Sequence, residues 1–360
     1  METRMKKLTV IITTFIYSGL LMGCGSESIN APLGGNDDIS ASADGNTANS
    51  SATAASKQEP YNRSSRISDV MADPVFGSYG RLIFPVEREY WSGETLGSLR
   101  LTYYNNIDPD KTVEIANYLH DKASDGQTVF YDIYTDAEKA SDSRKEDTGL
   151  FFFRGKRGAR FAVCNAGGAF AYVGAMHDSF PHALELSKKG YNAFALIYRP
   201  GAQTACEDLA RAISFIFAHA DELGVDMSCY SLWGGSAGGR MAAWVSGYGV
   251  AAFGGDNLPK AGIAVIQYTG LSDYSRNDVA TYACVGDRDG IAYWHTMQDR
   301  LEGMSVLGIP TEFHVYEGLS HGFGLGTGTV AEGWINDAVS FWEKQMPKNG
   351  ETSGIHPVVY

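Results

Sequence analysis

The sequence contains few cysteines, few positive charges and no apolar run long enough to span a membrane comfortably. Only 5 of its 360 residues are cysteine, and no pair has C-x-x-C spacing. The four beyond Cys24 are therefore expected to be buried thiols rather than metal ligands. Lys and Arg total 29 against 42 Asp and Glu, which gives a formal net charge of −13. This acidic balance argues against nucleic acid or anionic lipid as a partner.

What the chain has instead is enough apolar material for a sizeable core. Hydrophobic residues make up 44% of it and charged residues 20%, a composition typical of globular proteins. The length permits two domains, but large α/β folds often use this many residues as one. No internal repeat is visible.

The first residues have the composition of an export signal. Arg4, Lys6 and Lys7 precede an apolar stretch from Leu8 to Met22, which is short for a transmembrane helix. The stretch ends in L-M-G-C at 21–24, which resembles the lipobox of bacterial lipoproteins. The resemblance implies that residues 1–23 are removed and that Cys24 carries a lipid. A plain secretory signal with an incidental cysteine is the alternative.

Composition also divides the rest of the chain. Residues 24–60 are rich in Ser, Ala, Asn, Gly and Thr and read as a flexible tether, because they cannot bury enough surface to order themselves. Residues 61–348 form the expected catalytic domain, in which 61–127 are an extra layer or a cover. Residues 349–360 are a tail. We therefore expect an extracytoplasmic protein held at a membrane by its lipid anchor, with no prediction of its oligomeric state.

From about residue 128, short apolar runs alternate with helical patterns, which predicts an α/β fold with a mainly parallel sheet and helices on both faces. The expected strands are 128–134, 149–153, 161–164, 191–198, 228–233, 263–268, 281–285 and 311–316. The expected helices are 181–189, 205–222, 237–248, 291–301 and 330–345.

A G-G-S-A-G run at 234–238 places Ser236 between an expected strand and an expected helix. A serine on such a sharp turn is held in strained backbone geometry with its hydroxyl exposed above the sheet. The flanking glycines leave room for the helix to pass close to the strand. Ser236 is therefore the candidate nucleophile.

Two further motifs follow strands at the edge of the sheet where α/β folds build their sites. G-D-R-D-G at 286–290 supplies Asp287 and Asp289, and H-G-F at 321–323 supplies His321. The order serine, acid, histidine is the one expected for an α/β-hydrolase triad. Upstream, N-A-G-G at 165–168 lies where a loop should provide an N–H group to an oxyanion.

With these motifs in order, the chain resembles an α/β-hydrolase of the esterase and lipase group related to hormone-sensitive lipase and bacterial acyl esterases. That group has H-G-G-G where this chain has N-A-G-G, which is the main departure. It also has a Tyr-Arg pair, here at 198–199, and an acidic residue opening the next helix, here at 207–208. The resemblance covers about residues 149–345. It favours Asp289 over Asp287, because the family places its acid three residues beyond the glycine.

Each residue then has a role in acyl transfer. Ser236 attacks a carbonyl, His321 accepts and returns the proton, and Asp289 orients the imidazole. The backbone N–H groups of Ala237 and of Gly168 or Ala169 would bind the oxyanion, and no metal or organic cofactor is required. The other histidines lack a motif, although His177 is near enough in sequence to the oxyanion loop to line the pocket. The glycine-rich run at 322–328 lacks dinucleotide-binding spacing and is read as a loop.

The expected function is hydrolysis of short acyl esters on a small alcohol or a carbohydrate. The connection between the expected strands at 263–268 and 281–285 is too short for a large inserted lid, which argues against a lipase acting on long-chain fat. Two alternatives stay open. One is a serine peptidase of the prolyl-oligopeptidase type, and the other is a lipoprotein binding module on an inactive hydrolase fold.

Overall fold

The computed structural model describes residues 59–105 and 107–347. The predicted signal segment, the lipid anchor at Cys24, nearly all of the predicted tether and the predicted tail lie outside these residues. Within the described part of the chain, no helix has both the length and the apolar character needed to cross a membrane.

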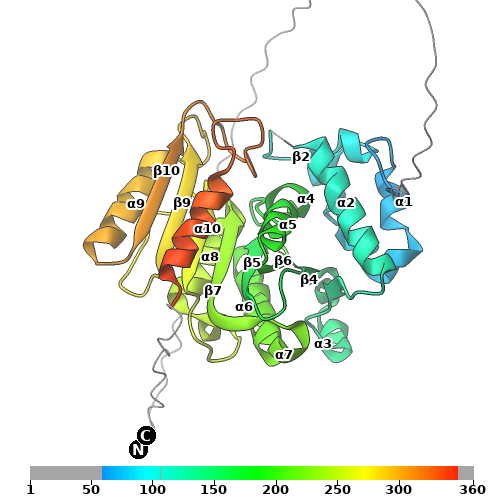
Figure 1. Cartoon of the computed structure of the whole chain (residues 1–360), viewed down its shortest axis with the longest axis horizontal. Coiled ribbons are helices and arrows are strands. Elements are labelled where there is room, and N and C mark those ends of the chain that lie inside the picture. Colours follow the sequence, from blue (N-terminus) through cyan, green and yellow to red (C-terminus); the bar gives the residue numbers. More distant parts are fainter. Residues whose placement is uncertain (1–58, 106, 348–360) are drawn as a thin grey trace, which may run out of the picture. The chain divides into compact units, whose positions relative to one another are not determined.

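The main sheet of the described residues has eight strands in the order β3-β4-β6-β5-β7-β8-β9-β10 (Figure 1). Strands β5 to β10 pair in parallel, whereas β4 pairs antiparallel with both β3 and β6. This is the α/β-hydrolase fold, as predicted. The strands are β3 (Phe130–Tyr131), β4 (Gly149–Phe153), β5 (Arg160–Asn165), β6 (Asn192–Ile197), β7 (Asp226–Gly235), β8 (Ile263–Gln267), β9 (Ala280–Gly286) and β10 (Thr311–Tyr316).

Helices cover both faces of this sheet. On β7, the Trp233 ring contacts Trp334 and Trp342 of α10, while a Cβ on the neighbouring Gly234 would meet Gly238 of α8 at 2.3 Å. Since successive strand residues point to opposite faces, α10 and α8 lie on opposite sides. The helices from here on are α3 (Asp136–Ser141), α4 (Ala175–Asp178), α5 (Phe180–Lys188), α6 (Ala202–Ala218), α7 (Ala220–Leu223), α8 (Ala237–Tyr248), α9 (Trp294–Val306) and α10 (Trp334–Gln345).

Several predicted boundaries were wrong. The first strand has two residues rather than seven, and the expected helix at 205–222 is two helices that meet at His219. Because α6 starts at Ala202, Asp208 lies in its second turn, where it pairs with Arg199 instead of opening the helix. The last two helices start three or four residues late, because the residues before them form turns, one of them held by Asp289.

Residues 61–127, which the sequence left unplaced, contain a helix that its periodicity did not reveal. Helix α2 (Pro109–Ser124) starts at Asp108, whose carboxylate accepts the N–H groups of residues 110 and 111. It packs against α4 and α5 at one end of the sheet (Figure 1). The segment also holds α1 (Ile67–Met71), 3₁₀ turns at 74–82, 88–90 and 96–98, and a two-stranded sheet of β1 (Trp91–Ser92) and β2 (Arg100–Leu101).

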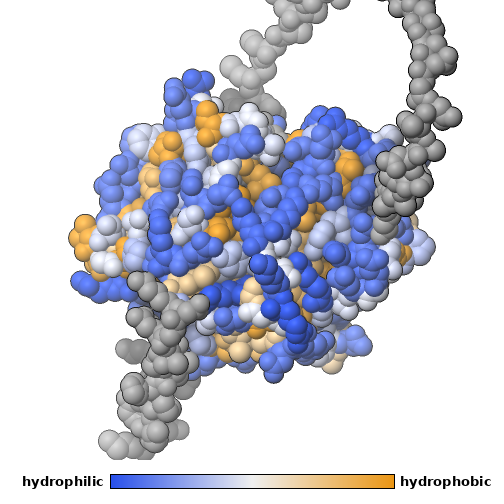
Figure 2. All heavy atoms as spheres, viewed as in Figure 1, coloured by the Kyte–Doolittle hydropathy of each residue, from blue (hydrophilic) through white to orange (hydrophobic). Residues whose placement is uncertain are grey.

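The core follows the central strands. Phe161, Ala162, Val163 and Cys164 of β5 are all at most 1% exposed, which fits a parallel strand covered on both faces. Of the four described cysteines, three are buried and all are free thiols. The expectation of buried thiols is therefore confirmed for Cys164, Cys206 and Cys284, and it is wrong for Cys229, which is partly exposed. Figure 2 shows that hydrophilic residues cover most of the viewed face, with hydrophobic ones in small groups.

Candidate active site

The turn between β7 and α8 holds Ser236 in a strained conformation. Its φ of 51° and ψ of −118° lie where side-chain-bearing residues are rare. Its N–H donates to the carbonyl oxygen of Gln267 on β8 at 2.9 Å, and its carbonyl oxygen accepts the N–H of Arg240 at 3.1 Å. Both neighbouring elements therefore fix the backbone, while the side chain stays partly exposed.

Close packing explains the glycine at 238. A Cβ added there would lie 2.0 Å from the carbonyl oxygen of Asn165 at the end of β5. Helix α8 can thus pass directly over the end of β5 only because this position has no side chain. The turn predicted from the glycine pattern is the turn that the structure contains.

The structure brings Ser236, His321 and Asp289 into one hydrogen-bonded chain. His321 Nε2 lies 3.0 Å from Ser236 Oγ, and His321 Nδ1 lies 2.8 Å from Asp289 Oδ2. The carboxylate accepts only, so Nδ1 donates to it, and the unprotonated Nε2 accepts the serine proton. The Asp289 side chain is fully buried, and its Oδ1 accepts the N–H groups of Ile291 and Ala292.

Asp287, the alternative acid, has a different hydrogen-bond partner. Its Oδ1 accepts the N–H of Gly318 at 2.6 Å, in the loop after β10. It therefore bonds to the segment between β10 and His321, which is called the histidine loop below together with residues 321–324. The carboxylate that bonds to His321 itself belongs to Asp289.

The candidate oxyanion donors come from two segments. Ala237 is the first residue of α8, where a helix has no internal acceptor for its N–H groups. The loop after β5 lies against the nucleophile, since a Cβ on Gly167 would be 2.9 Å from Ser236 Cβ. The Gly167 N–H donates a hydrogen bond to the Asp178 carboxylate at 2.7 Å. Within the described residues, the N–H groups of Gly168 and Ala169 donate to no acceptor, so they are available to a ligand.

Asp178 and Tyr268 are buried residues beside these groups to which the sequence did not point. The Tyr268 ring meets the His321 ring edge-on at 5.0 Å, and its O–H donates to Asp178 at 2.5 Å. His177 is buried, and its Nε2 lies 2.9 Å from the carbonyl oxygen of Gly322. Neither Asp178 nor Tyr268 belongs to a recognisable motif, so only their position in the fold identifies them.

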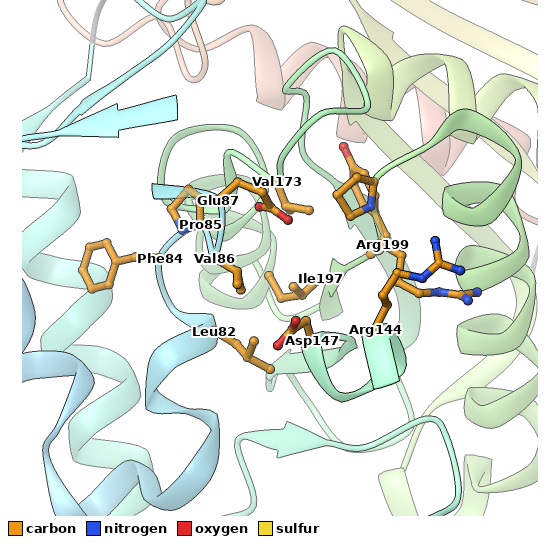
Figure 3. A pocket seen from close by; sticks show the side chains of 12 residues that line it. Leu82, Phe84, Pro85, Val86, Glu87, Arg144, Asp147, Val173, Ile197 and Arg199 are labelled. Carbon is orange, nitrogen blue, oxygen red and sulfur yellow. The ribbon is translucent and has the colours of Figure 1, made fainter. Parts of the chain in front are cut away.

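A cavity of about 180 Å³ is lined in part by Val173, in the segment that follows the loop after β5 (Figure 3). Its lining includes the apolar side chains of Leu82, Val173 and Ile197 and the charged side chains of Glu87 and Arg144. Burial raises the pKa of the Glu87 carboxyl. Ser236 is not among the residues that line this cavity. The described residues contain no cluster of His, Cys, Asp or Glu suited to a metal ion.

Comparison with known proteins gives one matching family model. The BD-FAE family model matches residues 155–259, which include the loop after β5 and the turn at Ser236. No curated protein matches the chain.

Similar solved structures are 18 to 20% identical to it over the aligned residues. An acetyl ester-xyloside bifunctional hydrolase from Caldicellulosiruptor lactoaceticus is 18% identical over 55% of this chain and 88% of its own, with a TM-score of 0.49. An α/β-hydrolase enzyme from a Medee basin deep-sea metagenome library is 20% identical over 55% and 92%, with a TM-score of 0.47. Esterase 2 of Thermogutta terrifontis is 20% identical over 57% and 91%, with a TM-score of 0.46.

Proposed function

We propose that the chain is a serine hydrolase that cleaves carboxylic esters through an acyl-enzyme. One observation carries the proposal: the hydrogen-bonded chain from Ser236 Oγ through the His321 imidazole to the Asp289 carboxylate. A serine hydroxyl is a weak nucleophile on its own and needs a base within hydrogen-bond reach. His321 is that base, and Asp289 holds it in the required tautomer.

The reaction follows from this geometry. Ser236 Oγ bonds to the ester carbonyl carbon while His321 Nε2 takes the hydroxyl proton. The oxyanion accepts hydrogen bonds from the N–H groups of Ala237 and of Gly168 or Ala169, each worth about 3 kcal/mol in comparable sites. When the carbonyl re-forms, the C–O bond to the alcohol breaks and His321 returns the proton to it. Water then attacks the acyl-enzyme by the same steps and releases the acid.

We infer a short acyl group on a small alcohol or a carbohydrate as the substrate. The support is the short connection between the end of β8 at Gln267 and the start of β9 at Ala280, which leaves no room for a large inserted lid. We also propose that Cys24 carries a lipid and that the enzyme acts outside the cytoplasm at a membrane surface. That part rests on residues 1–24 alone.

A panel of p-nitrophenyl esters tests the proposal. We expect the purified chain to hydrolyse the acetate and butyrate, to act poorly on long acyl chains, and to lose this activity in Ser236→Ala. Faster turnover of aminoacyl nitroanilides than of esters would instead support a peptidase. A fluorophosphonate should label wild-type protein at Ser236 and leave Ser236→Ala unlabelled. Folded wild-type protein that resists labelling would favour a non-catalytic binding module.

A further inference from the structure

A buried carboxylate lies directly behind the catalytic turn, and the proposed mechanism does not use it. Asp178, the last residue of α4, is only 1% exposed. It accepts hydrogen bonds from the Gly167 N–H at 2.7 Å, the Tyr104 O–H at 3.0 Å and the Tyr268 O–H at 2.5 Å. Burying a carboxylate is costly unless its oxygens are bonded, and here three donors from separate parts of the chain converge on it.

Two of those donors belong to segments that contact the reacting groups. Gly167 lies against Ser236, as the 2.9 Å between its would-be Cβ and Ser236 Cβ requires. Tyr268 places its ring edge against the His321 ring at 5.0 Å, and its oxygen accepts the N–H of Gly324 at 3.2 Å. Asp178 is therefore linked to the oxyanion loop directly and to the histidine loop through a single tyrosine.

The direction of these hydrogen bonds is settled by chemistry. Burial, and then the nearby Asp178 charge, raise the pKa values of Tyr104 and Tyr268 well above their ordinary range. Both phenols consequently stay protonated and donate, and the carboxylate can only accept. An asparagine could not accept from all three donors in the same geometry, because its amide nitrogen is itself a donor.

The residue before Asp178 acts on the histidine loop from the same turn. His177 Nε2 donates to the carbonyl oxygen of Gly322, immediately after His321. The contact is tight, since a Cβ on Gly324 would lie 2.8 Å from the His177 ring. Consecutive residues of α4 thus hold the two loops that flank Ser236.

Backbone strain concentrates around this carboxylate. Ala169, Phe170, Ser236 and Tyr268 all have positive φ, between 36° and 59°. Side-chain-bearing residues keep such conformations only where their surroundings hold them in place. A bonded carboxylate in contact with the oxyanion loop and the catalytic turn is a group that can do this. The contact with the catalytic turn is close, because a Cβ added to Gly235 would lie 2.4 Å from Asp178 Oδ2.

We propose that Asp178 is a positioning residue of the active site, a role that rests on the proposed ester hydrolysis. By holding the Gly167 N–H, it sets the loop so that the N–H groups of Gly168 and Ala169 stay free for the oxyanion. Through Tyr268, it fixes the ring of His321 against Ser236. The role is exerted mainly in the transition state, so its loss lowers kcat rather than raising KM.

The test is Asp178→Asn in the full chain, with kcat for p-nitrophenyl acetate expressed per serine labelled by a fluorophosphonate. We expect kcat to fall about 100-fold, the size of losing one oxyanion donor, with KM changed less than about threefold. Tyr268→Phe should lose about tenfold, and the double variant should resemble Asp178→Asn alone, because both changes break one network. A purely structural role would lower the labelled fraction and leave kcat per labelled serine intact.

Tyr230→Phe is the matched control. Tyr230 is also a buried tyrosine and lies on β7, six residues before Ser236. Its O–H, however, donates to the carbonyl oxygen of Pro259 at 3.0 Å. It should lose stability and keep kcat. If Asp178→Asn does not fold, the same kcat measurement on Tyr268→Phe and Tyr104→Phe tests the proposal, because each removes one donor to Asp178. Wild-type kcat in the Asp178 and Tyr268 variants of an active enzyme would overturn this proposal alone, whereas an inactive, unlabelled wild type would overturn the esterase function with it.

Discussion

Asp287 and Asp289 are two residues apart, yet only one of them can serve the histidine. The Asp289 side chain is fully buried, with Oδ2 on His321 and Oδ1 on two backbone N–H groups. Asp287 instead accepts the N–H of Gly318. A carboxylate held on both oxygens has one orientation, which is what fixing an imidazole tautomer requires.

Changing Asp289 to Asn should therefore lower kcat by about a thousandfold or more with little change in KM, because the imidazole loses the acceptor that sets its tautomer. Asp287→Asn is the matched control. Its amide oxygen can still accept the Gly318 N–H, so its kcat should stay within about threefold of wild type. Steady-state rates on p-nitrophenyl acetate compare the two, and loss of activity in Asp287→Asn alone would reverse the assignment.

Residues with a motif could be found from the sequence, and residues without one could not. Ser236, Asp289 and His321 each follow a strand within a glycine-bearing turn, so their types and order pointed to one chemistry. Asp178 and Tyr268 have no such setting. Nothing in a single sequence distinguishes a buried Asp from a solvated one, and their value depends on contacts between segments 90 residues apart.

At the scale of elements, the site depends on how closely α8 approaches the strands. A side chain at 238 would collide with the backbone of β5, since its Cβ would lie 2.0 Å from a carbonyl oxygen. At 247, in the same helix, the nearest atom to an added Cβ is 3.5 Å away on Asp278. Replacing these two glycines with alanine should therefore have opposite effects on stability.

We expect Gly238→Ala to destabilise the protein by several kcal/mol or prevent folding, because backbone atoms cannot move aside as a side chain can. Gly247→Ala should be neutral or stabilising by up to about 1 kcal/mol, because alanine is the better helix former and meets only ordinary contact. Thermal unfolding of both variants measures the difference. Equal stability of the two would mean that α8 does not pack on β5 as closely as described.

Predicted elements were most accurate where strands are buried on both faces. The apolar runs of β5 to β9 stand out because neither face meets water, whereas β3 pairs over only two residues at the edge of the sheet. Helix α2 was missed because its buried residues, such as Ile115 and Leu119, are few among many charges. Its start signal in the sequence is Asp108 before Pro109.

At the scale of the molecule, residues 61–127 are part of the site rather than a separate appendage. Tyr104 comes from this segment and donates to Asp178, and Tyr90 stacks on Tyr172 at 5.0 Å, in the segment after the oxyanion loop. The sequence placed neither contact, because they join residues 74 and 82 positions apart. The predicted export signal, the predicted lipid at Cys24 and nearly all of the predicted tether lie outside the described residues and stay predictions.

The whole molecule should lose stability in mild acid because it buries neutral histidines. Burial lowers the pKa values of His177 and His182, while in the unfolded chain a histidine titrates near about 6.5. As pH falls below that value, the unfolded state takes up protons that the native state does not. Unfolding is then favoured, by at most about 1.4 kcal/mol per pH unit for each such proton.

Thermal unfolding between about pH 7 and pH 5 measures this slope, in a window above the titration of ordinary carboxyl groups. We expect His182→Phe to reduce the change of unfolding free energy with pH by the contribution of one histidine proton. This expectation holds whatever the effect of the substitution on stability at pH 7. If wild type and His182→Phe lose stability in parallel, the buried histidines do not govern acid unfolding, and the charges of the surface do.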